Sequence, residues 1–125
     1  MIYPFSAPLM DFLVLSIIRK EDSYGYQISQ QLKSVSSMKD STLYPILKRL
    51  SDSGYVDTYD QPFQGRNRKY YRITDSGCTQ QEFLLHEWKT YTQAIEAILQ
   101  DKKELLKEEN PQDQAEIMKG GQKHE

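Results

Sequence analysis

The chain has 125 residues, of which 38% are hydrophobic and 27% charged, with a formal net charge of −2 and a mean hydropathy of −0.74. This composition fits one small folded domain with an appended solvated element, and it argues against a disordered chain or a nonspecific polycation. No apolar run approaches the roughly 20 residues of a membrane span, and the N-terminus lacks the basic segment of a secretory signal. We therefore expect a cytoplasmic protein with no membrane partner.

The distribution of charge is more informative than its sum. Residues 33–72 hold eight basic and four acidic side chains, a net charge of +4, so the rest of the chain carries −6. The middle of the chain is basic and its ends are acidic.

The first two predicted elements are helices. Residues 8–20, PLMDFLVLSIIRK, are apolar on most sides, which is typical of a helix buried on more than one face. Pro8 suits its first turn and Ser6 its N-cap. A polar turn follows, and YGYQISQQLKSV then predicts a short second helix with Tyr24, Ile28 and Leu32 at i, i+4 and i+8.

The next stretch, STLYPILKRL at residues 41–50, combines a helical pattern with an internal proline. Its apolar residues recur at i, i+3, i+4 and i+7: Leu43, Ile46, Leu47 and Leu50. We predict a third helix that begins at Ser41 or Thr42, both good N-caps, and stops at Gly54. Pro45 then falls in or next to the first turn, where backbone N–H groups have no intrahelical partner.

The spacing of apolar residues changes from helical to alternating after residue 54. YVDTYD at 55–60 alternates and predicts a strand, and RKYYRIT at 68–74 predicts its partner. Between them, QPFQGRN carries Pro62 and Gly65 as turn residues, which indicates a hairpin loop too long for a two-residue turn.

A long helical pattern covers residues 76–108, with Thr74 as its expected cap. Apolar residues follow steps of 4 and 3 in a heptad seam that is broken once by Lys102: Leu84, Trp88, Tyr91, Ile95, Ile98, Lys102 and Leu105. Leaving such a seam in water is unfavourable, because burying each large apolar side chain contributes about 1.5–3 kcal/mol. The first five of these residues are therefore predicted to mediate dimerisation.

This order of elements predicts a mostly α fold with a small β-hairpin. It is the layout of a winged helix-turn-helix domain (1–75), followed by a C-terminal dimerisation helix (76–108) and a solvated tail (109–125).

In a helix-turn-helix the second helix lies in the major groove, and its N-terminal residues contact base edges. The face opposite the leucine stripe presents Ser41, Tyr44, Pro45 and Lys48, and Lys48 and Arg49 can reach phosphates or guanine. At the hairpin turn, GRNRK places three basic residues in five, suited to grip the backbone or enter the minor groove. Each feature alone could be an ordinary solvated surface, but both occur where a winged helix meets DNA. The predicted DNA contacts are Lys39, Ser41, Thr42, Tyr44, Lys48, Gly65, Arg66, Asn67, Arg68 and Lys69.

The segments SYGYQISQQL, STLYPILKRLSDSGYV and GRNRKYYRIT resemble the PadR family of bacterial transcriptional regulators, over roughly residues 9–77. The resemblance implies a homodimeric repressor that binds a near-palindromic operator in double-stranded DNA. It implies recognition-helix contacts at Ser41, Thr42, Tyr44 and Lys48 and wing contacts at Arg66, Arg68 and Lys69. Gly25 and Tyr26 match the second-helix motif, whereas Tyr24 stands where the family often has histidine and Asn67 where it often has proline.

The single long C-terminal helix resembles the small PadR subfamily, whose multidrug-sensing members carry a tryptophan that lines a flat apolar pore at the dimer centre. Trp88 occupies the matching position, and Thr92 that of the family's acidic partner. The resemblance implies a small planar aromatic effector bound there. The alternative for Trp88 is packing within the heptad seam.

An enzyme is not expected. Cys78, His86 and His124 have no neighbours in the sequence that make a nucleophile–base pair or a metal-ligand cluster, so no metal or cofactor is expected either. The alternative function is a winged-helix module that binds another protein and no DNA. DNA binding weakens steeply with salt, whereas association through an apolar seam does not.

Overall fold

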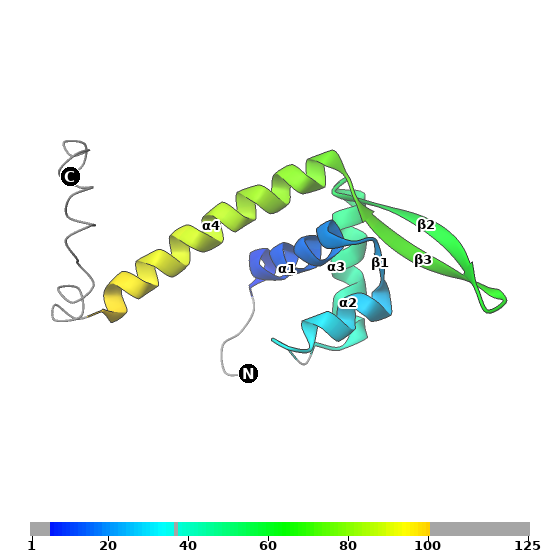
Figure 1. The fold of residues 1–125 in the computed structure, drawn as a ribbon, viewed down its shortest axis with the longest axis horizontal. Coiled ribbons are helices and arrows are strands. Elements are labelled where there is room, and N and C mark those ends of the chain that lie inside the picture. Colours follow the sequence, from blue (N-terminus) through cyan, green and yellow to red (C-terminus); the bar gives the residue numbers. More distant parts are fainter. Residues whose placement is uncertain (1–5, 37, 101–125) are drawn as a thin grey trace, which may run out of the picture. The chain divides into compact units, whose positions relative to one another are not determined.

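A computed structural model of the protein describes residues 6–36 and 38–100 (Figure 1). In chain order its elements are α1 (Ala7–Lys20), β1 (Ser23–Tyr24), α2 (Gly25–Leu32), α3 (Asp40–Asp52), β2 (Val56–Phe63), β3 (Arg66–Ile73) and α4 (Asp75–Leu99). This is the mostly α architecture with a small antiparallel hairpin that the sequence predicts. The chain forms two compact units that divide between Trp88 and Lys89, within α4.

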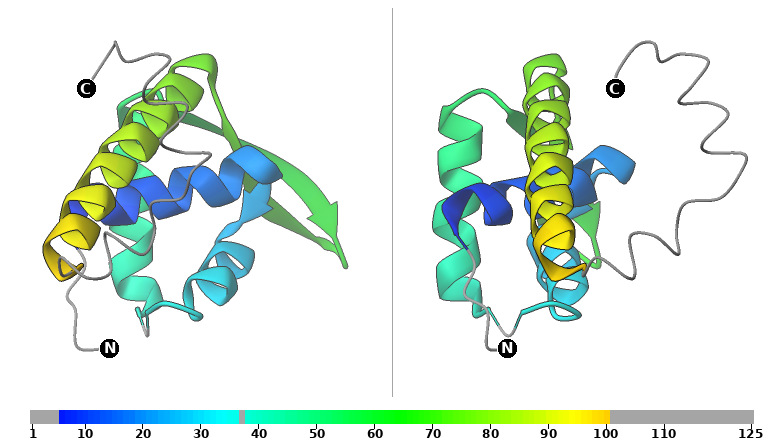
Figure 2. Two further views of the ribbon diagram at one scale, coloured as in Figure 1. Left: turned by 60° about the vertical axis from the view of Figure 1, so that its left-hand side comes forward. Right: turned by 90° about the vertical axis from the view of Figure 1, so that its left-hand side faces the viewer.

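The helices α1, α2 and α3 pack on one another and on the base of the sheet, and the β2–β3 hairpin extends away from them (Figure 2). α1 is the central helix of this core and has buried residues on more than one side, as its largely apolar sequence predicts. The core consists of Met10, Val14, Leu15, Ile17, Ile18, Ile28, Leu32, Leu43, Leu47, Leu50, Val56 and Tyr71. Ser6 caps α1 as expected, since its hydroxyl accepts a hydrogen bond from the Leu9 N–H at 3.3 Å.

The start of α3 differs from the prediction. The helix begins at Asp40 with Lys39 as N-cap, and the Lys39 carbonyl accepts from the N–H groups of Thr42 and Leu43 at 2.9 and 3.2 Å. Ser41 and Thr42 therefore lie in the first turn and do not cap it. The Leu43 N–H is the first to bond four residues back, and Pro45 lies two residues beyond it, so the proline removes one hydrogen bond from the second turn. Gly54, with φ +82°, ends the helix as predicted.

The hairpin turn is also shorter than predicted. Phe63 pairs with Arg66, so only Gln64 and Gly65 form the turn, with φ of 52° and 80°. Positive φ at both central residues is the signature of a type I′ turn, whose twist matches that of the strands. Pro62, interpreted from the sequence as part of the loop, is instead a residue of β2. It is tolerated because β2 is an edge strand of the sheet, whose order is β1-β3-β2.

β1 is not predicted by the sequence. Ser23 and Tyr24 pair with Tyr71 and Tyr70 of β3, which makes β3 the central strand. Two residues are too few to show an alternating pattern, and they directly precede α2. α2 is correspondingly shorter than the predicted helical stretch, ending at Leu32.

α4 begins as the sequence predicts. The Thr74 hydroxyl accepts a hydrogen bond from the Gly77 N–H at 3.0 Å. The described helix ends at Leu99. The predicted continuation to residue 108, with Lys102 and Leu105 of the seam, and the predicted tail 109–125 lie outside the described residues.

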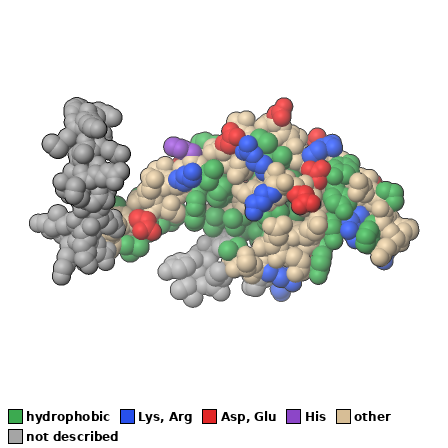
Figure 3. All heavy atoms as spheres, viewed as in Figure 1, with side chains coloured by type: hydrophobic (Ala, Val, Ile, Leu, Met, Phe, Trp, Pro, Cys, Tyr) green, Lys and Arg blue, Asp and Glu red, His purple; other side chains and the backbone are tan. Residues whose placement is uncertain are grey.

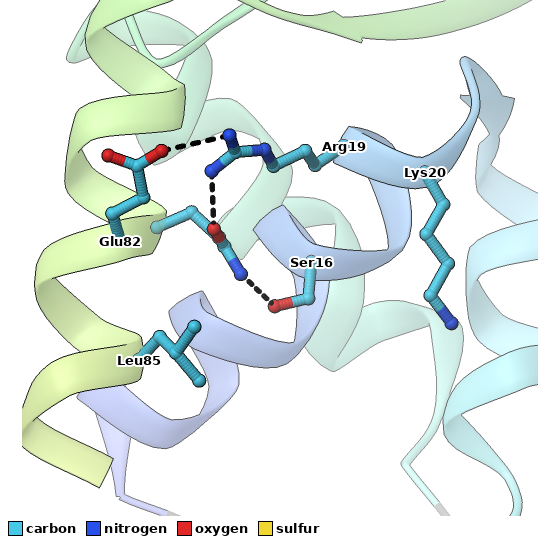
Figure 4. A pocket seen from close by; sticks show the side chains of 6 residues that line it. Ser16, Arg19, Lys20, Glu82 and Leu85 are labelled. Atoms are coloured by element: carbon cyan, nitrogen blue, oxygen red, sulfur yellow. Dashed lines mark hydrogen bonds and ion pairs between the residues drawn. The ribbon is translucent and has the colours of Figure 1, made fainter. Parts of the chain in front are cut away.

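A polar cluster ties the beginning of α4 to α1, around an open hollow of about 500 Å³ (Figure 4). The Arg19 guanidinium donates to Glu82 at 2.9 Å and to the Gln81 side-chain oxygen at 2.8 Å. The Gln81 amide donates to the Ser16 hydroxyl at 3.0 Å. These contacts join the first turns of α4 to α1. None of the described helices is long and apolar enough to cross a membrane.

We predict that Gly77→Ala destabilises the protein by about 1–3 kcal/mol, the typical effect of overpacking. A Cβ at this position would collide with the Tyr55 carbonyl oxygen and lie 2.7 Å from Ile73 Cγ1. Urea unfolding at fixed protein concentration measures the change. Thr79→Ala, one half-turn further along α4 at an exposed position, serves as the control and is expected to change stability by less than about 0.5 kcal/mol. Equal stability of the two variants would contradict the close approach of α4 to Tyr55.

Candidate nucleic-acid interface

The two faces of α3 differ sharply in burial. Leu43, Leu47 and Leu50 are fully buried against the other helices. The opposite side exposes the residues predicted to contact DNA on this helix: Lys39, Ser41, Thr42, Tyr44 and Lys48. Tyr44 is 46% exposed.

Two basic residues of α3 have carboxylate partners. Lys48 Nζ lies 3.0 Å from Asp52 Oδ2, and both side chains are exposed. A surface pair of this kind stabilises a helix little, so Lys48 can exchange it for a phosphate. Arg49 instead makes a bidentate pair with Asp11 of α1, at 2.9 and 2.6 Å, and the hydrogen bond to Asp11 raises the Arg49 pKa. The structure thus pairs Arg49, which the sequence suggested could reach phosphates or guanine, with Asp11 of α1.

Tyr44 lies directly over the first residue of α2. A Cβ added at Gly25 would collide with the Tyr44 hydroxyl oxygen and approach its Cε1 and Cζ to 2.8 and 2.9 Å. Glycine is therefore the residue that lets the Tyr44 ring pack here. Nearby, burial raises the pKa of Tyr71, and the adjacent Tyr44 raises it further.

Residues of α3 and of the hairpin line one hollow on the surface. A hollow of about 310 Å³ is lined by Tyr24, Gly25, Tyr26, Tyr44, Arg68, Lys69 and Tyr71. The aromatic residue of the predicted recognition helix and two basic residues of the predicted wing thus share one concave site. Basic and hydrophobic side chains lie next to one another over the hairpin (Figure 3). Tyr26 and Tyr71 were not among the predicted contacts; the glycine–tyrosine pair at the start of α2 was the signal for Tyr26.

The wing residues divide between the two faces of the hairpin. Side chains alternate along β3, so Arg66 and Arg68 project from one face and Asn67 and Lys69 from the other. Gly65 forms the tip, with the positive φ that glycine adopts readily. Lys69 is exposed and Arg68 is half-buried.

The seam residues of α4 occupy different environments. In the unit that ends at Trp88, Leu84 packs against the core, and the Trp88 ring lies 6.3 Å from that of Phe12, centroid to centroid. In the unit that begins at Lys89, Tyr91, Ile95 and Ile98 are exposed, Ile98 to 82%. The Thr92 hydroxyl donates to the Lys89 carbonyl at 3.2 Å.

Comparisons with known proteins agree with this fold. A model of the transcriptional regulator PadR-like family matches residues 14–82. An uncharacterized Lysinibacillus sphaericus protein, protein X, is 31% identical over 96 residues, which cover 73% of this chain and 88% of that protein. The negative transcriptional regulator PadR of Bacillus subtilis is 34% identical over 99 residues, which cover 74% of this chain. The chain matches about half of that regulator's length, 52%.

Solved structures are similar as well. The Streptococcus mutans UA159 protein smu.1704 is 52% identical with a TM-score of 0.75, covering 79% of this chain and 93% of that one. A PadR family transcription regulator of Clostridium difficile R20291 is 32% identical with a TM-score of 0.67, and the match covers 73% of this chain and 98% of that one. Bacillus subtilis PadR in complex with operator DNA is 29% identical with a TM-score of 0.55, and the match covers 64% of this chain and 46% of that one.

The fold and the joined helix-and-wing surface define a winged helix-turn-helix protein. The family match, which covers more than half of the chain, identifies it further: the chain belongs to the PadR-like family of transcriptional regulators. The protein is accordingly a transcriptional regulator and not an enzyme.

A double-mutant cycle tests the Tyr44–Gly25 contact without DNA. Gly25→Ala should lower the free energy of unfolding by about 1–3 kcal/mol while Tyr44 is present, because the ring must be displaced. In the Tyr44→Ala background the same substitution should have less than half that effect. Urea unfolding of the four proteins measures both values. The same loss in both backgrounds would show that the ring does not occupy this place.

Proposed function

We propose that the protein is a homodimeric repressor that binds a pseudo-palindromic operator in double-stranded DNA. The observation that carries this proposal is the hollow in which Tyr44 of α3 meets Arg68 and Lys69 of the hairpin. A duplex that receives α3 in its major groove brings the adjoining backbone and minor groove against the wing. Similarity to Bacillus subtilis PadR, whose structure was solved with operator DNA, supports the same class of partner.

In this proposal each side chain has a role set by its chemistry. The hydroxyl groups of Ser41 and Thr42 and the ring of Tyr44 contact base edges, where hydroxyls can donate or accept and the ring can meet a thymine methyl. Phosphate contacts come from exposed basic side chains at α3 and on the hairpin: Lys39, Lys48, Arg66 and Lys69. Gly65 allows the wing tip, with Asn67 beside it, to approach the duplex closely.

The proposed division of the chain is a DNA-binding domain at 1–75, a dimerisation helix at 76–108 and a solvated tail at 109–125. Exposed apolar side chains on α4 support the dimerisation role, since water-exposed stripes of this kind mark interfaces. A two-fold dimer places two recognition helices about 34 Å apart, which matches half-sites one helical turn apart.

We further propose a small planar aromatic effector at the dimer interface, stacked on Trp88 near Thr92. Trp88 is 40% exposed, although its ring also contacts Phe12. An exposed indole face suits stacking against a flat aromatic molecule.

DNA binding is tested with a duplex selected from a random-sequence library by repeated binding, and with a nonspecific duplex of the same length. Tyr44→Ala should weaken binding to the selected duplex roughly ten- to a hundredfold, the loss expected for a base contact, and change nonspecific binding far less. Lys69→Ala and Arg68→Ala should weaken both. Each should also lower the slope of log affinity against log salt by about 0.9. Fluorescence anisotropy at several salt concentrations measures all of these.

Lys20→Ala is the matched control, because Lys20 is an exposed lysine at the end of α1, outside the proposed interface. It should leave affinity and salt slope unchanged. If the protein binds no duplex at low salt, the proposal is wrong and the alternative, a winged-helix module that binds another protein, is favoured.

Ile98→Asp should convert the dimer to monomer, because a carboxylate in an apolar seam loses its hydration without a partner. Sedimentation equilibrium measures the change in mass. Gln93→Asp makes a similar charge change at an exposed position outside the seam and should leave the dimer intact. Dimers in both variants, or monomers in the unmodified protein, would contradict the proposed interface.

Trp88 is the one tryptophan of the sequence, so emission excited selectively from tryptophan, and not from the nine tyrosines, reports on it alone. A planar aromatic ligand stacked on Trp88 should quench this emission saturably, and the same ligand should lower affinity for the selected duplex. If no planar aromatic dye in a panel quenches the emission saturably, Trp88 serves only as a packing residue.

A further inference from the structure

Arg68 lies at the centre of an aromatic cluster on one face of the sheet. Its strand, β3, is central, and Tyr24 of β1 pairs with Tyr70, two residues along from Arg68. On the other side, Gln61 of β2 pairs with Arg68, and Phe63 lies two residues beyond it. Residues offset by two on neighbouring strands share a face and are within reach of long side chains. Arg68 therefore has an aromatic neighbour on each flanking strand.

Both rings lie against the guanidinium. Its carbon, Cζ, is 3.9 Å from the centroid of the Tyr24 ring and 3.5 Å from that of Phe63. Two rings cannot occupy the same side of one planar group at such distances, so the guanidinium lies between them. Each contact is a cation–π interaction of about 0.5–1 kcal/mol at an exposed site, and more where water is excluded.

The ring of Tyr24 is itself held in place. It meets the Tyr70 ring edge to face, with centroids 5.4 Å apart, and Tyr70 stacks on Tyr59 at 5.6 Å. The Tyr59 hydroxyl donates to Asp22 at 2.7 Å, and this hydrogen bond raises the Tyr59 pKa. The Tyr24 N–H donates to the Gln27 side-chain oxygen at 3.1 Å at the start of α2. The aromatic cluster thus connects the wing to the helix-turn-helix.

Arg68, like Arg66 at the start of β3, has no anionic partner among the residues that the structure describes. Arg19, Arg49 and Arg72 each face a carboxylate. Among the described residues, the Arg68 side chain donates no hydrogen bond and forms no ion pair, although the two rings cover the faces of its guanidinium. Only the edge of the guanidinium, which carries its N–H donors, is left for a partner.

We propose that Tyr24 and Phe63 are positioning residues that hold Arg68 so that its edge donates to an acceptor in the plane of the guanidinium on bound DNA. The acceptor is a phosphate oxygen or a base atom at the groove floor, which present the same chemistry to this fork. Because the two rings restrict the side chain before binding, less rotamer freedom is lost when DNA binds. This inference rests on the proposed function and adds two residues that do not themselves need to touch DNA.

A double-mutant cycle on affinity for the selected duplex tests the inference. Tyr24→Leu and Phe63→Leu should each weaken binding about three- to tenfold while Arg68 is present. In the Arg68→Ala background each should change affinity by less than about twofold. Both single variants keep the charge of Arg68, so their salt slopes should stay close to that of the unmodified protein. Losses of equal size in the two backgrounds would overturn the proposal.

Conservative variants separate positioning from charge and from folding. Tyr24→Phe retains the ring and should bind as the unmodified protein does. Arg68→Lys retains the charge but has no planar edge, so it should bind almost as poorly as Arg68→Ala. Phe83→Leu, which alters an exposed phenylalanine on α4, is the matched control for Phe63→Leu and should have no effect.

A measurement without DNA distinguishes this inference from the proposed function. In the free protein, the Arg68 Nε–Hε resonance should show a ring-current shift that disappears in Tyr24→Leu and Phe63→Leu. If the shift is present but the protein binds no duplex, both the proposed function and the DNA role of Arg68 are wrong. If the protein binds DNA but the shift is absent, only the positioning role is overturned.

Discussion

The packing of Tyr44 on Gly25 is the contact on which the proposed interface depends. It fixes the outer face of α3 against the first residue of α2, at a site where a single methyl group would displace the ring. Lys69 of the wing lines the same hollow. The ring proposed to read bases and the lysine proposed to bind phosphate therefore line one hollow, and a Cβ at Gly25 would collide with that ring.

The wing depends on a second set of contacts, because a two-stranded hairpin alone is marginally stable in water. β1 adds a third strand, and stacked aromatic rings on one face brace β3 against both neighbours. The two-residue turn with Gly65 at its second position keeps the strands paired up to Arg66. The basic residues of the wing are thus carried by paired strands, where the sequence had suggested a longer loop, so their directions are set before any partner binds.

Much of this arrangement can be predicted from the sequence, because apolar residues at helical spacing indicate where the helices lie. The leucine stripe of α3, the cap at Thr74 and the stop at Gly54 are all local signals, and the structure confirms them. The features that the sequence did not predict depend on residues far apart in the chain or on segments too short to show a pattern. The pair between Arg49 and Asp11 joins residues 38 apart, and Pro62 looks like a loop residue until β2 is known to be an edge strand. The position of Arg68 between the rings of Tyr24 and Phe63 could be predicted only if the register of all three strands were known.

The most direct test of the account is to map, on the protein, which residues respond to DNA. Backbone amide resonances of an isotopically labelled sample would be followed while a selected duplex is added at low salt. The account predicts that residues 39–48, at the N-cap and first turns of α3, and residues 65–69 of the hairpin shift together at the same DNA concentration, while the exposed end of α1 at Lys20 does not. Shifts confined to α4, or to only one of the two basic segments, would contradict a joint helix-and-wing interface.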